Sequence, residues 1–393
     1  MPGVGGRKWA IYAHYLQKAG IVLRVISGTP GPGDSSPWDS YVHDIDVVHI
    51  ANRYPGILNS SPDTILEKIR YRLSLLWLKA ITKGNYYDRG ILSESALMEA
   101  MDKGLNALDT KNLIVSGGPF SLLYYGALLK ERHPELNFIA DIRDEWTADH
   151  FYGHGGLSKA RKREEEARLS KVLQQADKII LSYHITRLAY SERYPQYAQK
   201  LIVLEHGADP DMEISARRQY RGKPVRLLNF GSLLGRQEKT MQILGRYLAQ
   251  SKGDVQLEFY TREQKYKQIF RESGAYPEHV IYHSEIPSKD IFTTLKDRTA
   301  ALLFLPDYMK DMRSTKFMEV IAARVPIVLV AKAGEVSRFI TDHRLGVFLN
   351  ADNLEEEIGK LTQLLEKMDY NESFDYSPWQ LSRQAQQIEG MLK

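Results

Sequence analysis

Short apolar runs alternate with longer amphipathic segments along most of the chain. The runs cover residues 21–27, 45–51, 112–116, 137–141, 177–182 and 201–205 in the first half, and 225–231, 255–260, 279–283, 299–305, 326–330 and 345–349 in the second. Each is nearly continuously apolar and rich in β-branched residues, as is typical of strands buried on both faces. Because helical patterns separate most neighbouring runs, the sequence predicts βαβ units and parallel sheets.

This alternation lapses between Gly207 and Pro224, where the chain is polar and rich in turn-forming residues. We interpret the stretch as a linker between two α/β domains, each a Rossmann-like, doubly wound parallel sheet. The predicted domains are 1–210 and 225–377, and a terminal helix within 378–393 is expected to cross back to the first. Such sheets bind ligands at the carboxyl ends of their strands, so loops from both domains are expected to line a cleft.

The amino terminus lacks the strand with which a doubly wound domain normally opens. A glycine-rich stretch, Gly3 to Gly6, is followed directly by a helical pattern over 9–19. We therefore expect the first domain to lack its first strand, which would leave helix faces uncovered.

A basic amphipathic helix is predicted between residues 66 and 81. Its apolar positions recur at helical spacing, and they are Leu66, Ile69, Leu73, Leu76 and Ala80. Its flanking residues are Lys68, Arg70, Arg72, Lys79, Lys83 and Trp77. One interpretation is a helix that lies on an anionic membrane. We favour the other, a helix packed on its own sheet with a solvated basic face, because most amphipathic helices are core elements.

Composition narrows the class of protein. The chain is 43% hydrophobic and 26% charged with a net charge of +4, which suits a globular protein with anionic small ligands and argues against nucleic-acid binding. It has no cysteine, which excludes disulfides and thiolate chemistry. No apolar run is long enough to span a bilayer, and no signal peptide precedes the first helix. The expected location is cytoplasmic, with peripheral association at the inner face of the membrane as a second interpretation.

The strongest candidate for chemistry is the segment 311–328, in which a polar loop precedes a predicted helix and strand. Ser314 or Thr315 can cap the helix and leave amides for an anion, and Lys316 adds a full charge beside them. Glu319, about one turn further on, can accept hydrogen bonds from sugar hydroxyls. The alternative is a capped surface helix with a solvated lysine.

This segment resembles the donor-binding motif of retaining-type GT-B glycosyltransferases, the family-four group. In that group the helix start holds the nucleotide's diphosphate and the glutamate binds the ribose hydroxyls. The resemblance implies these roles for Ser314, Thr315, Lys316 and Glu319. Asp311 stands where the group's paired-acid motif has its first glutamate.

Two further stretches resemble donor-binding parts of the same group. In 228–239, Gly231 permits a tight turn, and Ser232 stands where many relatives have arginine. Lys239 matches the family lysine, and Arg236 is the candidate substitute for the missing arginine. Gly5 and Gly6, within residues 3–7, resemble the flexible glycine loop that approaches the transferred sugar and diphosphate.

The segment 137–146 resembles the group's Asp-x-Arg-Asp-x-Trp element at the carboxyl end of a strand. It makes Asp144 the acceptor-side or base candidate. The alternative is structural, with Asp141 and Arg143 tying loops together as a buried ion pair. Residues 206–209 resemble a structural turn at the domain junction, and among the histidines His14 is the one outside candidate for the site.

The resemblance implies a metal-independent glycosyltransferase without a cofactor, with catalytic candidates Asp144 and Lys316. It would move a sugar from a nucleotide-sugar donor to a cell-surface glycan or lipid-linked acceptor, with retention implied by the family. The alternatives are a nucleotide-sugar 2-epimerase of the same fold and a non-catalytic, sugar-binding partner protein. No metal-ligand spacing is found among the histidines and acids.

Overall fold

The chain folds into two compact units. The computed structural model of the 393-residue chain describes residues 4–29, 39–59, 62–108, 110–149, 153–208, 222–261, 263–284, 286 and 290–392. Unit 1 comprises Met1–Glu205 and Leu381–Lys393, and unit 2 comprises His206–Gln380. Gly3 of the glycine segment, Asp209 of the junction turn and residues 209–221 of the predicted linker lie outside the described residues.

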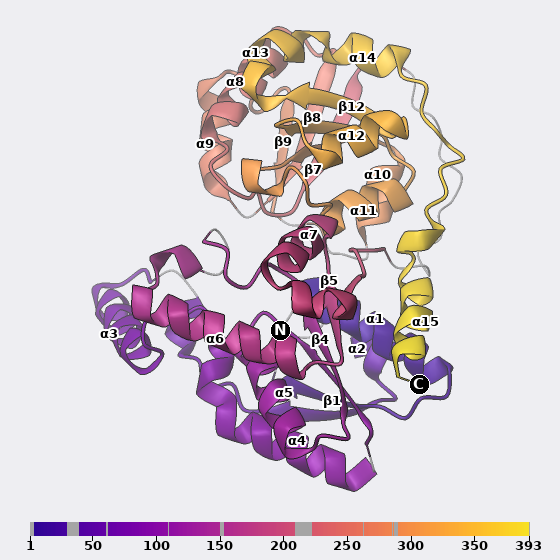
Figure 1. Cartoon of the computed structure of the whole chain (residues 1–393). Coiled ribbons are helices and arrows are strands. Elements are labelled where there is room, and N and C mark those ends of the chain that lie inside the picture. The colour runs from indigo at the N-terminus through magenta and orange to yellow at the C-terminus, as the bar shows by residue number, and fades with distance from the viewer. Residues whose placement is uncertain are drawn as a thin grey trace. The chain divides into compact units, whose positions relative to one another are not determined.

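Unit 2 is built on a parallel sheet of six strands in the order β12-β11-β10-β7-β8-β9 (Figure 1). The strands are β7 (Val225–Phe230), β8 (Val255–Tyr260), β9 (Val280–His283), β10 (Ala300–Phe304), β11 (Ile327–Ala331) and β12 (Gly346–Asn350). The helices are α8 (Glu238–Gln250), α9 (Gln264–Glu272), α10 (Ile291–Lys296), α11 (Thr315–Ala322), α12 (Glu335–Asp342), α13 (Leu354–Glu357) and α14 (Leu361–Lys367).

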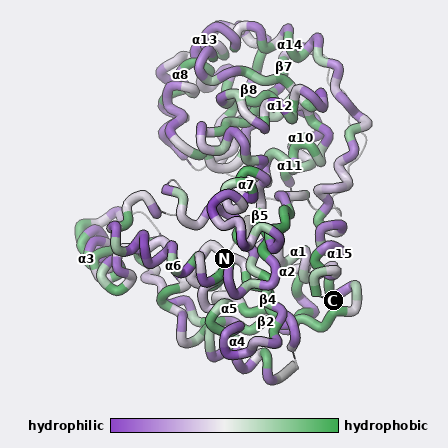
Figure 2. Tube along the Cα trace, viewed as in Figure 1, coloured by the Kyte–Doolittle hydropathy of each residue, from purple (hydrophilic) through white to green (hydrophobic). Residues whose placement is uncertain are grey.

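Two hydrophobic clusters fill the two faces of this sheet. Apolar residues of α8, α9, α13 and α14 form one cluster with the strands, and those of α10, α11 and α12 form the other. Strands β10 and β11 are buried along their whole length, which is why their sequences are continuously apolar. Figure 2 shows β7 and β8 as a hydrophobic centre among helices of mixed polarity.

Unit 1 contains a parallel four-stranded sheet in the order β3-β4-β5-β6 and a separate parallel pair, β1-β2. The strands are β1 (Arg24–Gly28), β2 (Asp46–Ile50), β3 (Asn112–Ser116), β4 (Asn137–Ile142), β5 (Lys178–Leu181) and β6 (Leu201–Val203). The helices are α1 (Val4–Lys18), α2 (Asp39–Val42), α3 (Ile65–Ile81), α4 (Glu94–Leu108), α5 (Ser121–Arg132), α6 (Lys159–Gln175), α7 (His184–Arg193) and α15 (Leu381–Met391).

In unit 1 the edge strands are less buried than the inner strand β4 of the four-stranded sheet. Strands β1 and β3 are only half-buried, whereas β4 is almost entirely buried. One hydrophobic cluster nevertheless contains Met98 of α4 and touches both Ile26 of β1 and Leu113 of β3. Helix α1 begins at Val4, the first described residue, so the expected lack of a first strand stays a prediction.

The last helix, α15, forms part of the core of unit 1. Ile388 and Met391 pack with Ile11 and Tyr12 of α1 in one buried cluster. The Tyr12 hydroxyl donates to Gln384 Oε1 at 2.5 Å, which joins the two helices by a polar contact as well.

Two sequence interpretations are wrong. The predicted glycine loop is helical where it is described, because α1 begins at Val4 and includes Gly5 and Gly6. Glycine lowers helix propensity by about 1 kcal/mol per residue, but the buried face of α1 outweighs that preference. The predicted core helix at 66–81 forms as α3, yet its apolar side chains are exposed and only Leu78 is buried.

Candidate functional site

The strand order of unit 2 defines where a ligand is expected. The chain passes from β7 to β8 and β9 on one side, and then returns to β10 on the other side of β7. In open parallel sheets the crevice outside the carboxyl ends of the strands at such a reversal is the usual binding site. The loop that follows β7 and the segment that joins β10 to α11 both leave the sheet at this point.

Gly231 permits close contact between these two segments. Its φ is +77°, in the left-handed region that favours glycine, and its amide donates to the Tyr260 carbonyl at 3.0 Å. A Cβ at this position would lie 3.3 Å from Lys316 Cε. The absence of a side chain at Gly231 therefore allows Lys316 to lie against the β7 loop.

The start of α11 has the expected capped geometry. Ser314 is the N-cap, with φ −74° and ψ 164°, and its hydroxyl accepts from the Phe317 amide at 3.3 Å. Thr315 is the first residue of the helix. The amides of Thr315 and Lys316 have no partner inside the helix, so the positive end of the helix dipole remains able to bind an anion.

Lys316 carries its charge into this crevice. Its side chain is half-buried, and Nζ donates to the Ser232 carbonyl at 3.3 Å and lies 5.6 Å from the centroid of the Phe230 ring. Burial lowers the pKa of Lys316 to about 8, although the nearby carboxylates of Glu319 and Glu263 act in the opposite direction. The lysine is therefore still mainly cationic at neutral pH, but only partly solvated.

Two carboxylates accompany the lysine. Glu319 lies within α11 and is buried, with only 4% of its surface exposed. Glu263, which the sequence analysis missed, follows β8, and its Oε1 accepts from the Leu233 amide in the β7 loop at 3.2 Å. Its position just beyond the carboxyl end of a buried strand is the signal that could have identified it.

The Asp311 carboxylate accepts a hydrogen bond from another helix, α12. Its Oδ1 accepts from the amide of Glu335 at 2.7 Å, at the start of α12, and its Oδ2 accepts from Lys310 Nζ at 2.9 Å. Partial burial opposes ionisation, but these two donors outweigh it and hold the pKa of Asp311 below its ordinary value. The Asp311 carboxylate thus caps α12.

The remaining donor-side candidates lie on the connection between β7 and α8. Ser232 contributes its carbonyl to the Lys316 contact, while Arg236 and Lys239 extend their side chains into solvent. The structure therefore brings Gly231, Ser232, Ser314, Lys316 and Glu319 together. Arg236 and Lys239 lie further along the same connection, with exposed side chains.

In unit 1, polar side chains gather at the carboxyl ends of β3 and β4. Asp141 is fully buried and accepts from Trp9 Nε1 at 2.6 Å and from Ser116 Oγ at 2.7 Å. Arg143 donates to the carbonyls of Gly117 and Gly118 at 2.9 and 3.1 Å. These residues tie loops together, but through these partners instead of through an ion pair with each other.

Asp144 lies half-buried beside this cluster and close to a buried lysine. Burial lowers the pKa of Lys8, while the charges of Asp141 and Asp144 oppose that shift. The sequence analysis missed Lys8, which is only 6% exposed and donates to the Leu204 carbonyl at 3.4 Å. Gly6 and Gly5 lie two and three residues before Lys8, in the first turn of α1.

Solved structures share this arrangement of elements over nearly the whole chain. The lipopolysaccharide outer core galactosyltransferase WaaB superposes with a TM-score of 0.60 at 14% identity, over 100% of this chain and 96% of that chain. Anabaena HepE, solved in complex with UDP and glucose, superposes with a TM-score of 0.58 at 13% identity, over 100% of this chain and 96% of that chain. A UDP-N-acetylglucosamine 2-epimerase superposes with a TM-score of 0.54 at 12% identity, over 98% of this chain and 92% of that chain. The chain has the GT-B fold.

The sequence itself matches no protein-family model and no curated protein. The predicted fold class is confirmed by the GT-B likeness, and it does not depend on sequence identity. Because a 2-epimerase is among the similar structures, the GT-B fold alone does not separate sugar transfer from epimerisation.

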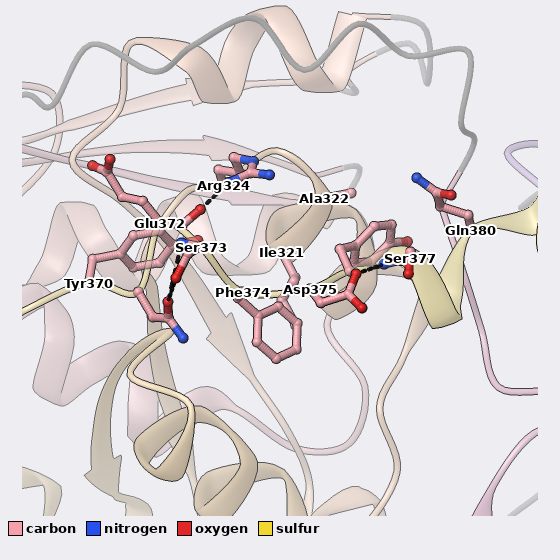
Figure 3. A pocket seen from close by; sticks show the side chains of 12 residues that line it. Ile321, Ala322, Arg324, Tyr370, Glu372, Ser373, Phe374, Asp375, Ser377 and Gln380 are labelled. Carbon is pink, nitrogen blue, oxygen red and sulfur yellow. Dashed lines mark hydrogen bonds between the residues drawn. The ribbon is translucent and has the colours of Figure 1, made fainter.

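A pocket of about 290 Å³ lies elsewhere in the second GT-B unit, at the far end of α11 from Lys316. Ile321 and Ala322 of α11 line it together with the chain from Tyr370 to Ser377 (Figure 3). Arg324 donates to the Glu372 carbonyl at its edge. None of the predicted site residues lines this pocket.

Neither a metal-binding cluster nor a membrane-spanning helix is found among the described residues. Within them, no cluster of three or more His, Asp or Glu side chains could hold a metal ion. His14 instead packs edge-on against Tyr15 and Tyr41, with ring centroids 5.4 and 5.6 Å apart. No described helix has the length and apolarity needed to cross a bilayer.

Proposed function

We propose that this protein is a glycosyltransferase that moves a sugar from a nucleoside diphosphate sugar onto a glycan or lipid-linked acceptor. The observation that carries the proposal is the contact between Lys316 Nζ and the Ser232 carbonyl, at 3.3 Å. It places a cation and the start of α11 together at the strand-order reversal of a parallel sheet. A diphosphate is the ligand that these groups fit best, because each of them favours negative charge.

In the proposed reaction the bond between the anomeric carbon and the diphosphate oxygen breaks, and its electron pair stays on that oxygen. The acceptor hydroxyl forms the new bond to the anomeric carbon and gives up its proton. Lys316 and the amides of Thr315 and Lys316 would stabilise the negative charge that grows on the diphosphate. Arg236 and Lys239 would extend that positive field, so the donor would need no metal.

We assign the other residues by their positions. Glu319 would accept hydrogen bonds from the ribose hydroxyls, and Gly5 and Gly6, in the first turn of α1, remain candidates for donor binding. Asp144 would take the acceptor's proton or bind the acceptor. A lipid-linked acceptor would bring the protein to a membrane surface, at the cytoplasmic face where nucleotide sugars are found.

The HepE structure supports a nucleoside diphosphate as the ligand class, since it was solved with UDP and glucose. The test is a thermal-shift and calorimetric screen against UDP, GDP, TDP and ADP, with wild-type protein and Lys316→Ala. A ligand that binds only the native state raises its melting temperature. We expect one or more of the nucleotides to stabilise the wild type, and Lys316→Ala to lose most of that effect.

If none of the nucleotides binds the wild-type protein, the proposal is wrong and a non-catalytic role is favoured. The 2-epimerase alternative is tested by incubating the protein with the matching nucleotide sugar and no acceptor. Accumulation of the 2-epimer would show that the protein is an epimerase and would overturn the proposal of sugar transfer. EDTA should leave the transfer rate unchanged.

A further inference from the structure

Helix α3 turns its apolar face toward solvent. Seven large apolar side chains on it are between 43% and 79% exposed, and they are Ile65, Leu66, Ile69, Leu73, Leu76, Trp77 and Ile81. The opposite face meets the protein through Leu78, which is 1% exposed. Ile65, Ile69, Leu73 and Leu76 repeat at intervals of three and four residues, so they form one continuous stripe.

The described residues of unit 1 leave this stripe uncovered. Figure 1 shows α3 at the periphery of unit 1, away from the strands, and Figure 2 shows that hydrophobic residues recur along this helix. Burial of such side chains typically stabilises a protein, so a solvent-facing stripe of this size points to a surface that is covered by something else.

The charges beside the stripe indicate what covers it. Lys68, Arg72 and Lys79 are exposed along one side, and Arg70 is exposed near Trp77. Glu67 is the one acid within the helix, and its carboxylate accepts from the amides of Asp63 and Thr64, both at 3.0 Å. Its charge is therefore directed to the helix start, and the sides of the stripe are left cationic.

Local interactions keep the helix formed without much packing. Thr64 and Glu67 make a capping box at the amino end. At the other end Lys79 lies 5.2 Å from the Tyr86 ring, and Tyr87, next to it, is 49% exposed. Tryptophan and tyrosine side chains of this kind favour the boundary between water and lipid.

We propose that α3 is a membrane-docking helix that lies in the surface of an anionic bilayer, with Leu66, Ile69, Leu73, Leu76 and Trp77 inserted among the acyl chains. The cations of Lys68, Arg72 and Lys79 contact lipid phosphates. This is the geometry of an interfacial amphipathic helix, which is parallel to the membrane and does not cross it. The inference is independent of the proposed catalytic function.

The test is co-sedimentation of the full chain with vesicles of phosphatidylcholine alone, or with about one third phosphatidylglycerol. We expect binding to the anionic vesicles, weaker binding at high salt, and little binding to the neutral ones. The double variant Leu73→Glu/Leu76→Glu should bind at least about tenfold more weakly, because it places charge in the inserted stripe.

Two further variants separate the contribution of the cationic side chains to vesicle binding from that of the apolar stripe. Lys68→Gln/Arg72→Gln/Lys79→Gln should lose the preference for anionic vesicles. Leu188→Glu is the matched control, since Leu188 on α7 is 65% exposed, like Leu76 at 64%, but belongs to no such stripe. It should bind vesicles as the wild type does.

The proposal is overturned if the wild type does not bind anionic vesicles, or if the double glutamate variant binds them equally well. Sedimentation velocity tests the alternative that a second copy of the chain covers the apolar stripe of α3. A dimer that the same variant dissociates, without vesicle binding by the wild type, would assign the stripe to a second copy of the chain. Nucleotide binding by each variant, measured by calorimetry, reports on the proposed function separately, because α3 contains none of its residues.

Discussion

At the scale of single residues, Lys316 combines two properties that are usually in conflict. It is charged at neutral pH, yet burial beside Phe230 and the β7 loop lowers its pKa to about 8. Partial desolvation weakens the competition of water for its charge, so that a bound anion gains more from it. The same burial makes the charge sensitive to pH in a range that experiments can reach.

The first prediction concerns that sensitivity. Below pH 8 the Lys316 side chain of the free protein is already protonated and carries the positive charge that attracts the diphosphate. Above pH 8 this side chain must take up a proton when the ligand binds. The dissociation constant for the nucleotide diphosphate should therefore rise as the pH passes 8, by up to about tenfold per pH unit. Calorimetry between pH 7 and 9.5 measures it.

Lys316→Arg supplies the control for this experiment, because arginine stays protonated throughout that range. Its affinity should change much less with pH, even if its absolute affinity differs. A wild-type affinity that is flat across pH 8 would show that Lys316 does not contact the ligand.

The second prediction concerns turnover. Lys316→Ala should lower the rate of sugar transfer by about 10²-fold or more, the usual cost of removing one group that stabilises a developing anion. Lys332→Ala is the matched control, since Lys332 also follows a strand of the same sheet but pairs with Asp307 at 2.7 Å. Equal rates for both variants would remove Lys316 from the reaction.

At the scale of elements, the strands were the most predictable part. Each predicted run overlaps a strand whose ends differ from it by a few residues at most, for example β1 at 24–28 against the run at 21–27. This succeeds because a strand buried on both faces must be apolar at every position, which leaves little ambiguity. The cap at Ser314 was predictable for a similar reason, since it depends only on neighbouring residues.

Helix α3 shows where that kind of reasoning stops. The spacing of Leu66, Ile69 and Leu73 predicts that the helix has an apolar face, and this is correct. Spacing contains no information on what the face meets, which depends on where distant segments lie. The lowered pKa of Lys316 and the hydrogen bond that Asp311 accepts from α12 were unpredictable for the same reason, since both depend on residues distant in sequence.

The third prediction belongs to α12. Because the Asp311 carboxylate accepts from the Glu335 amide, Asp311→Ala should cost unit 2 about 1 kcal/mol of stability, as loss of a helix cap does. Asp311→Asn keeps an oxygen acceptor and should restore most of it. Urea unfolding measures the stability, and calorimetry measures nucleotide affinity.

A contact between Asp311 and the donor would give a different result. In that case Asp311→Asn would weaken nucleotide binding while leaving unfolding almost unchanged. The two outcomes separate a capping residue from a donor-binding one.

At the scale of the whole molecule, the fold is discontinuous in sequence. Unit 1 is closed by α15, which comes after all of unit 2 in the chain. Ile388 is fully buried against α1, and the carbonyl of Met391 accepts from Asn137 of β4 at 3.0 Å. The terminal helix is therefore a structural part of unit 1.

The fourth prediction tests that role. Ile388→Ala should destabilise unit 1 by about 2–4 kcal/mol, the usual range for truncating a fully buried isoleucine. Hydrogen exchange should then accelerate at the amides of α1 and β4 and stay unchanged in the sheet of unit 2. Gln387→Ala, on the exposed side of the same helix, should leave both unchanged.

The late position of α15 also sets an order of events during synthesis. Domains usually fold from the amino terminus onward as the chain leaves the ribosome. Here unit 2 has all its residues before unit 1 does, because the helix that covers Ile11 and Tyr12 follows unit 2 in the chain. The amino-terminal half must wait with an uncovered apolar surface, and its maturation depends on a segment that is translated after all of unit 2.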